Sequence, residues 1–366
     1  IPDYINDETL KIASDGTAAI TLPWAHEALT ADFFRVGADL LMVAKNGDKI
    51  LIEDYFLNLQ LQDVLTAGGA KISANVIEKL CGNPLPGVYA QGTSSSIADG
   101  DPIGRITLTE GIVRIKRSDG AEEEVEAGAA IFEGDVVETN ENSSVGIEFE
   151  DKTTLSLGAD ARMVLDEFVY NPAENTGNLG VSVLQGAFAF VSGEVAKLSP
   201  DAMTVTTPTA TIGIRGTKVA GIAAAEGELS TISLLPEGDG SVGVIAITND
   251  GGSVVLTEAG ATIQLTSFNQ APPPPIILSP TEISSKFGGA LNALPPSSSS
   301  PSNGGQSPDE DAEGDQGNNA GEDEVIDEAI EEAKDITEGL KQQAKNAQLE
   351  GKLAAQRLGE RVNEAR

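Results

Sequence analysis

The chain of 366 residues contains one cysteine, one histidine and one tryptophan, and aromatic residues make up only 4% of it. Because Cys81 is the only cysteine, no disulfide can form within the chain. His26 is the only histidine, so a zinc site built from Cys and His ligands is excluded, and a His-based catalytic triad has little basis. We therefore expect a protein without enzymatic activity.

Positive charge is also scarce. The chain has 23 basic and 57 acidic residues, a formal net charge of −34. Such a surface repels nucleic acids and anionic membranes, so we expect neither as a direct partner. No apolar run approaches the ~18–20 residues that a spanning helix needs, so we expect no membrane-spanning segment in these residues. The composition is typical of an extracytoplasmic protein, either secreted, at the cell surface or in the periplasm.

Turn signals predict a small N-terminal β-domain over residues 1–91. The pair Asn46-Gly47 lies between two apolar runs, and this is the strongest local signal for a β-hairpin. Helix is expected only around residues 73–80. Residues 92–102, rich in Gly, Ser and Asp, are interpreted as a short linker.

Residues 103–268 form a succession of short apolar segments separated by Gly, Asp and Asn turns. One example is Ser118-Asp119-Gly120, which separates two strand-like segments. This pattern predicts a second β-domain, built as a sandwich, a roll or a short β-solenoid. The expected fold class is therefore all-β, with two β-domains.

Composition changes after this domain. Residues 269–323 are rich in Pro, Ser and acidic side chains and are expected to form a disordered linker that buries no core. In residues 324–366, apolar side chains recur at spacings of three and four, which predicts a C-terminal helix suited to association.

Arg215 stands in an otherwise apolar strand, between Gly213 and Gly216. An arginine in such a place must find an acceptor or mark a surface that another molecule recognises. Alternation along a strand puts Ile212 and Ile214 on one face and Arg215 on the other. We interpret Arg215 as a structural donor, with partner binding as the alternative.

The candidate interaction or structural motif has eight residues, in the segment around Arg215 and in an earlier turn where an aspartate is expected to cap backbone N–H groups. These residues are Thr207, Pro208, Gly213, Arg215, Gly216, Thr217, Gly134 and Asp135.

Acidic clusters offer no good metal or catalytic site. Residues 309–315 begin like an EF-hand loop, but Ala320 stands where the bidentate glutamate is required, so Ca²⁺ has no support from this motif. Asp166 and Glu167 are adjacent on a predicted strand and point to opposite faces, which argues against a glycosidase pair. We expect no cofactor and no metal.

Six short motifs occur in an order that resembles the FecR-type domain over roughly residues 103–225. They are GIVR at 111–114, GDVVET at 134–139, FEDKTTLSL at 149–157, VLQGAF at 183–188, TPTA at 207–210 and GIRGT at 213–217. The first region resembles the small β-domain that precedes large bacterial surface adhesins.

The resemblance implies two kinds of role. In regulatory members, the periplasmic domain receives a signal from an outer-membrane transporter, and a cytoplasmic segment controls a sigma factor. Other members carry the domain as a structural or interaction module. Since these residues lack a transmembrane helix and a cytoplasmic segment of that kind, we expect first a non-enzymatic structural or interaction protein. It would be a surface adhesin, a fibre component or an envelope scaffold.

Such a protein would act through docking of its β-domains and helix-mediated association, with a protein partner or with itself as a homo-oligomer or filament. The alternative is a periplasmic, signal-receiving FecR-like regulator. A polysaccharide-binding module is third.

Overall fold

The computed structural model describes residues 9–14, 16, 19–24, 27–58, 60–82, 101–199, 202–224 and 228–296. His26, most of the linker expected at 92–102 and the helix expected at 324–366 lie outside these residues.

The N-terminal region, residues 9–82, has two small sheets. The first has the strand order β1 (Leu10–Ala13), β5 (Lys49–Glu53), β4 (Asp39–Val43) and β3 (Asp32–Val36), and the second has the order β2 (Ile20–Thr21), β6 (Val64–Leu65) and β7 (Lys71–Ile72). The helices are α1 (Glu27–Thr30) and α2 (Ala74–Cys81), with a 3-10 turn, η1, at Tyr55–Leu57. The hairpin predicted at Asn46-Gly47 joins β4 to β5, and the helix expected near residues 73–80 is α2.

The β-domain, residues 101–296, is built from two ladders of strands that share β16. The first ladder has the order β10 (Glu122–Glu124), β9 (Val113–Lys116), β12 (Val136–Thr139), β15 (Arg162–Asn171), β16 (Thr176–Val191), β17 (Met203–Thr207), β18 (Ala210–Arg215), β21 (Val244–Asn249) and β22 (Gly252–Leu256). The second ladder has the order β11 (Ala130–Ile131), β8 (Gly104–Glu110), β13 (Ser144–Phe149), β14 (Thr154–Leu157), β16, β19 (Lys218–Ala223), β20 (Ser230–Leu235), β23 (Ala261–Leu265) and β24 (Ile276–Ile277). A 3-10 turn, η2 (Val195–Lys197), follows β16.

The long strand β16 passes from one ladder to the other at Gly186. Residues up to Gln185 pair with β15, and residues from Gly186 pair with β19. Gly186 has a φ of +95°, and a Cβ there would overlap Ala161, so only glycine fits. The all-β fold class is confirmed.

The inner faces of the two ladders form one hydrophobic core. Alternation along β18 follows the expectation from sequence, since Ile212 and Ile214 are buried in this core while Gly213 and Arg215 are half-buried on the other face. The other core strands contribute side chains in the same way, among them Ile115, Val137, Ile147, Leu155, Met163, Val181, Phe188, Phe190, Val205, Val219, Leu234, Ile247 and Ile263.

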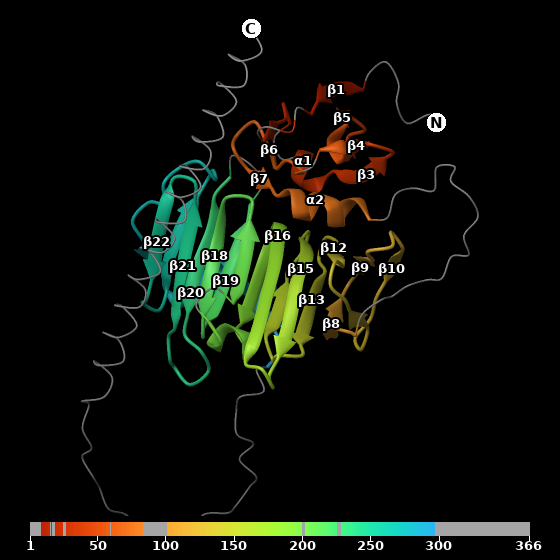
Figure 1. The fold of residues 1–366 in the computed structure, drawn as a ribbon. Helices are drawn as coiled ribbons and strands as arrows, with labels where there is room; N and C mark the ends of the chain where they lie inside the picture. Colours follow the sequence, from red (N-terminus) through yellow and green to blue (C-terminus); the bar gives the residue numbers. More distant parts are fainter. Residues whose placement is uncertain are drawn as a thin grey trace, which may run out of the picture. The chain divides into compact units, whose positions relative to one another are not determined.

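The first ladder is also buried on its outer face. Val136, Val164 and Leu184 point away from the β-domain core and pack in one hydrophobic cluster with the N-terminal region. Figure 1 shows that region, in red to orange, with α2 lying over the strands around β12 and β15. The consecutive apolar residues Val136 and Val137 follow from burial of both strand faces. The division into two domains at residues 92–102 stays a prediction.

The prediction that residues 269–323 form a disordered linker is wrong for the first part of this range. Residues 276–277 form β24, and Pro280–Ala293 form α3. Phe287 and Ala290 of α3 pack on the outer face of the second ladder against Ala189, Ala220 and Leu235. The sequence held a helix start that we missed, because Ser279 and Glu282 form a capping box with Pro280 in the first turn. No helix in the described part of the chain is long and apolar enough to cross a membrane.

Phe287→Ala should destabilise the fold by about 3–5 kcal/mol, because it removes a fully buried ring and leaves a cavity under α3. The control Ser285→Ala changes an exposed residue of the same helix and should leave stability within about 0.5 kcal/mol. Denaturant unfolding of both variants and the wild type measures the difference. Equal midpoints for all three would contradict the packing of α3 on the ladder.

Candidate functional site

The structure separates the eight motif residues rather than gathering them in one cleft. Thr207 and Pro208 precede β18, whereas Gly216 and Thr217 follow it, so the two pairs lie at opposite ends of that strand. Gly134 and Asp135 precede β12, which three strands separate from β18 in the first ladder.

The threonines of the motif are satisfied inside the fold. The Thr207 hydroxyl donates to the Ala210 carbonyl (2.9 Å) and accepts from the Ala210 N–H (3.1 Å). The fully buried Thr217 donates its N–H to the Ser192 hydroxyl (2.8 Å), and its own hydroxyl accepts from the Gly243 N–H (3.2 Å). These groups close turns between strands and do not face an open cavity.

The segment around Arg215 packs tightly at the backbone. A Cβ at Gly243 would overlap the carbonyl oxygens of Arg215 and Gly216, so the neighbouring chain approaches this turn more closely than a side chain permits. Gly216 has a φ of +49°, whereas a Cβ at Gly213 would meet only one atom, at ordinary contact distance. The role of Arg215 stays a proposal.

Asp135 holds its turn through a buried ion pair. Its Oδ2 atom accepts from Arg117 Nη1 (2.5 Å) and from the Phe132 N–H (2.8 Å), and the side chain is only 1% exposed. Arg117 also donates to Glu123 and to the carbonyl of Ala130. The pair ties β9 and β10 to the turn before β12.

A second buried carboxylate, Asp151, received no role in the sequence analysis. It accepts from the Thr153 hydroxyl (2.7 Å) and from the N–H groups of Thr153 (3.0 Å) and Val195 (3.1 Å). A Cβ at Gly193 would overlap this turn, which explains the glycine. Asp151, which belongs to the FecR-like motif at 149–157, therefore joins the turn between β13 and β14 to η2.

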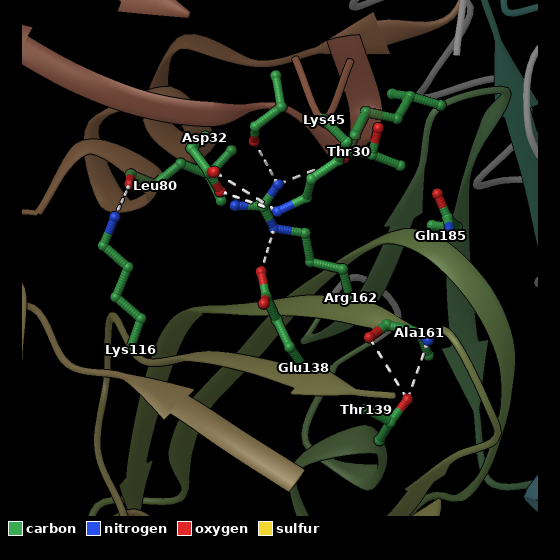
Figure 2. Close-up of polar contacts among 12 residues, drawn as sticks. Thr30, Asp32, Lys45, Leu80, Lys116, Glu138, Thr139, Ala161, Arg162 and Gln185 are labelled. Atoms are coloured by element: carbon green, nitrogen blue, oxygen red, sulfur yellow. Dashed lines mark hydrogen bonds and ion pairs between the residues drawn. The ribbon is translucent and has the colours of Figure 1, made fainter. Parts of the chain in front are cut away.

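Arg162 links the β-domain to the N-terminal region (Figure 2). Its Nη1 atom donates to the Ala31 carbonyl (2.7 Å), and its Nε atom pairs with Glu138 Oε1 (2.9 Å). The Arg162 side chain is 8% exposed, and its guanidinium lies 6.0 Å from the ring centroid of Phe33. The sequence analysis did not predict this interaction. The only signal in the sequence is the run of apolar residues in β15, which indicates a strand whose outer face is covered.

Further polar contacts secure the same interface. Lys116 Nζ donates to the Leu80 carbonyl (2.9 Å), which Figure 2 also shows. At another point, the Lys71 N–H donates to the carbonyl of Pro208 (3.0 Å), so a motif residue contacts the N-terminal region through its backbone. The N-terminal region is thus held at several places along the first ladder.

A cleft of about 410 Å³ lies beside Arg162, between the N-terminal region and the β-domain. Thr30 and Lys45 line it from one side and Glu138, Arg162 and Gln185 from the other. Lys45 pairs with Asp32 (3.2 Å) and Arg162 with Glu138, so two of its cations are already neutralised by neighbours. The cleft marks the interface between the two parts of the chain.

The described residues contain no group of three His, Cys, Asp or Glu side chains that could hold a metal ion. Burial raises the pKa of the Cys81 thiol to about 12, so this thiol is not a nucleophile near neutral pH. The buried polar groups of Asp135, Asp151 and Thr217 organise turns between strands.

Residues 135–237 match the family model described as FecR protein, so this part of the chain is a FecR domain. Two crystal structures of a candidate anti-sigma factor from Parabacteroides distasonis are similar, at 14% and 16% identity. Each match covers 41% of this chain and 62% of the other, with a TM-score of 0.32, so the chain spans less than two thirds of those proteins. No curated protein matches.

Arg162→Met should weaken the interface between the N-terminal region and the β-domain. The substitution keeps apolar packing but leaves the Ala31 carbonyl without its donor and Glu138 without its ion-pair partner, a loss of about 2–3 kcal/mol. Lysine should not restore stability, because it cannot reproduce the planar fork.

Limited proteolysis should then cleave between the N-terminal region and the β-domain faster in Arg162→Met. The control Arg114→Met removes an exposed cation that lines the same cleft. Equal cleavage rates and unfolding midpoints in both variants would show that Arg162 does not hold the interface.

Asp166 gives the stability a pH dependence. Burial raises the pKa of Asp166, although the hydroxyl of Ser182 and the nearby Lys79 act in the opposite direction. Stability from the neutral carboxyl is fully present below its ordinary pKa of about 3.9 and is lost as the pH rises through the raised pKa of the folded state. Asp166→Asn should therefore be more stable than the wild type at neutral pH, and the difference should vanish in acid.

Urea unfolding at a series of pH values checks this expectation. Glu174→Gln is the control, since it removes the same charge from an exposed residue that is not among the groups that shift the pKa of Asp166. If the free energy of unfolding of both variants changes with pH in the same way, the pH dependence comes from net charge and not from burial of Asp166.

Proposed function

We propose that this protein is a non-enzymatic, FecR-type regulatory module that receives a signal through a protein partner in the periplasm. The observation that carries this proposal is the match of residues 135–237 to the FecR family model. Regulatory members of that family transmit a signal by protein–protein contact and require no reaction centre. The described residues, whose buried polar groups serve turns and interfaces, are compatible with such a role.

The arrangement of the N-terminal region supports a role in transmission. It contacts the FecR domain through a shared hydrophobic cluster and through Arg162, so a partner that moves one part changes contacts of the other. Three of the contacts between the two parts are hydrogen bonds that lie at different places along the first ladder. They involve Arg162, Lys116 and Lys71.

The family match favours this regulatory role over the adhesin, fibre or scaffold role that composition placed first. A polysaccharide-binding role has little support in the described residues. Their exposed large apolar side chains are leucine, isoleucine and valine, whereas sugar-binding platforms usually present aromatic rings.

Deletion of the gene in its native bacterium should change transcription of a limited set of genes controlled by one alternative sigma factor. The full-length gene should restore the pattern, and so should a gene carrying Ser285→Ala. RNA sequencing of the three strains under identical growth conditions measures the effect. Unchanged transcription together with loss of cell attachment or of surface fibres would support the structural role instead.

A further inference from the structure

Four consecutive prolines, Pro272–Pro275, connect the two ladders of the β-domain. Before them, the side chain of Asn249, the last residue of β21 in the first ladder, donates to the Gln270 carbonyl (2.8 Å). Directly after them, β24 pairs with β23 of the second ladder. The proline run is therefore held at both ends by the fold and is not a free spacer.

The proline rings fix the conformation of this run. Each ring holds φ at about −65°, and a residue that precedes proline is pushed to an extended ψ of about +120° to +160°. Residues 272–274 meet both conditions, and the described peptide bonds are all trans. They therefore adopt the polyproline II conformation before any partner binds, so that binding costs little backbone entropy.

Most of the run faces solvent. Pro272 is half-buried, and a Cβ at Gly252 would lie 3.8 Å from its ring. Polyproline II has about three residues per turn, so Pro273 and Pro274 lie on the two sides that Pro272 does not occupy. Both are exposed, and so is Pro275.

Two exposed isoleucines extend this apolar surface. Ile276 is 46% exposed and Ile277 is 60% exposed, although both belong to β24. We call residues 273–277 the proline ridge. A continuous exposed apolar surface on an otherwise polar protein marks a contact with another molecule.

The proline ridge carries no charge in a strongly acidic protein. Residues 259–281 contain no Asp, Glu, Lys or Arg, whereas the whole chain has a net charge of −34. The partner that fits the ridge is therefore selected by apolar packing rather than by ion pairs. Flat aromatic side chains supply such packing, since the grooves that recognise polyproline II segments are lined with them.

A second copy of the chain is a poor occupant. The exposed large apolar side chains of the described residues are leucine, isoleucine and valine, so a second copy offers no exposed aromatic groove in that part. It would also bring the same net charge of −34.

We propose that the proline ridge docks, in the polyproline II conformation, into an aromatic-lined groove of a protein partner, with Ile276 and Ile277 packing at the end of that groove. The inference rests on the proposed regulatory function and specifies its docking surface and the chemistry of its partner.

A WW domain selected for binding the blocked peptide APPPPIIL, residues 271–278, is the probe, because the groove of a WW domain is aromatic. The full chain should bind this domain at least as tightly as the peptide does, since both ends of the run are already held. The NMR methyl signals of Ile276 and Ile277 should shift on titration, while those of the buried Ile212 and Ile214 stay unchanged. A WW domain whose groove tryptophan is replaced by alanine should not bind.

Variants of the chain separate the ridge from the rest of the surface. Pro273→Ala combined with Pro274→Ala should weaken binding about ten-fold or more, since it removes ring surface and loosens the backbone. Ile277→Thr keeps a β-branched residue in β24 and should weaken binding about three-fold or more. The matched control Pro236→Ala changes an exposed proline outside the ridge and should leave the affinity unchanged. Thermal unfolding of each variant verifies the fold, and the titrations of the wild type require no variant.

The same variants test the ridge in the native bacterium. A strain with Pro273→Ala and Pro274→Ala should show the transcriptional change of the deletion strain, whereas a strain with Pro236→Ala should resemble the wild type. RNA sequencing of these strains measures the effect.

The proposal is overturned if the peptide binds the WW domain but the full chain does not, or if the double proline variant keeps its affinity. A dimer of the chain that depends on the prolines would also overturn it, because the ridge would belong to a second copy. Altered transcription on deletion but not in the double proline strain would reject the ridge and leave the regulatory function in place. Unchanged transcription in both strains would reject the regulatory function, whatever the WW domain does.

Discussion

Burial of both faces of β12, β15 and β16 where they meet the N-terminal region is the constraint on which the described structure depends. Val137 and Met163 fill the core between the ladders, while Val136 and Val164, one position away, pack against the N-terminal region. A strand that is apolar on both faces cannot face water on either, so the N-terminal region and the FecR domain must dock. Arg162 sits at this contact, where it donates to the Ala31 carbonyl of the N-terminal region while it pairs with Glu138 of its own domain.

The outer face of the second ladder is covered by a helix rather than by the N-terminal region. Its outer face carries small residues such as Ser156, Ala189 and Ala220, and α3 covers them, with the Ser156 hydroxyl donating to the Ala290 carbonyl (2.7 Å). The N-terminal region and α3 thus each cover part of the outer face of one ladder. The acidic charge of the protein then determines which chains approach, because an anionic partner is repelled over the whole surface.

Local patterns in the sequence predicted much of the β-architecture. The Asn46-Gly47 hairpin, the helix near residues 73–80 and the alternation along β18 all depend on interactions between near neighbours, and the structure has each of them. The helix α3 was missed although its capping box was visible, since the preceding prolines suggested a spacer. The contacts of Asp151 with Val195 and of Arg162 with Ala31 could not be predicted, because these partners lie far away in the sequence.

The sequence by itself determined that the chain is β-rich, acidic and nearly without cysteine and histidine, and its ordered motifs indicated a FecR-type domain. Only the tertiary structure decided that the eight motif residues lie apart, that the N-terminal region shares a core with the β-domain, and that β22 pairs with β21 alone among the described strands. The physical reason is that composition and turn chemistry act locally, whereas the burial of a strand face or the exposure of an edge depends on which distant segments come to lie beside it.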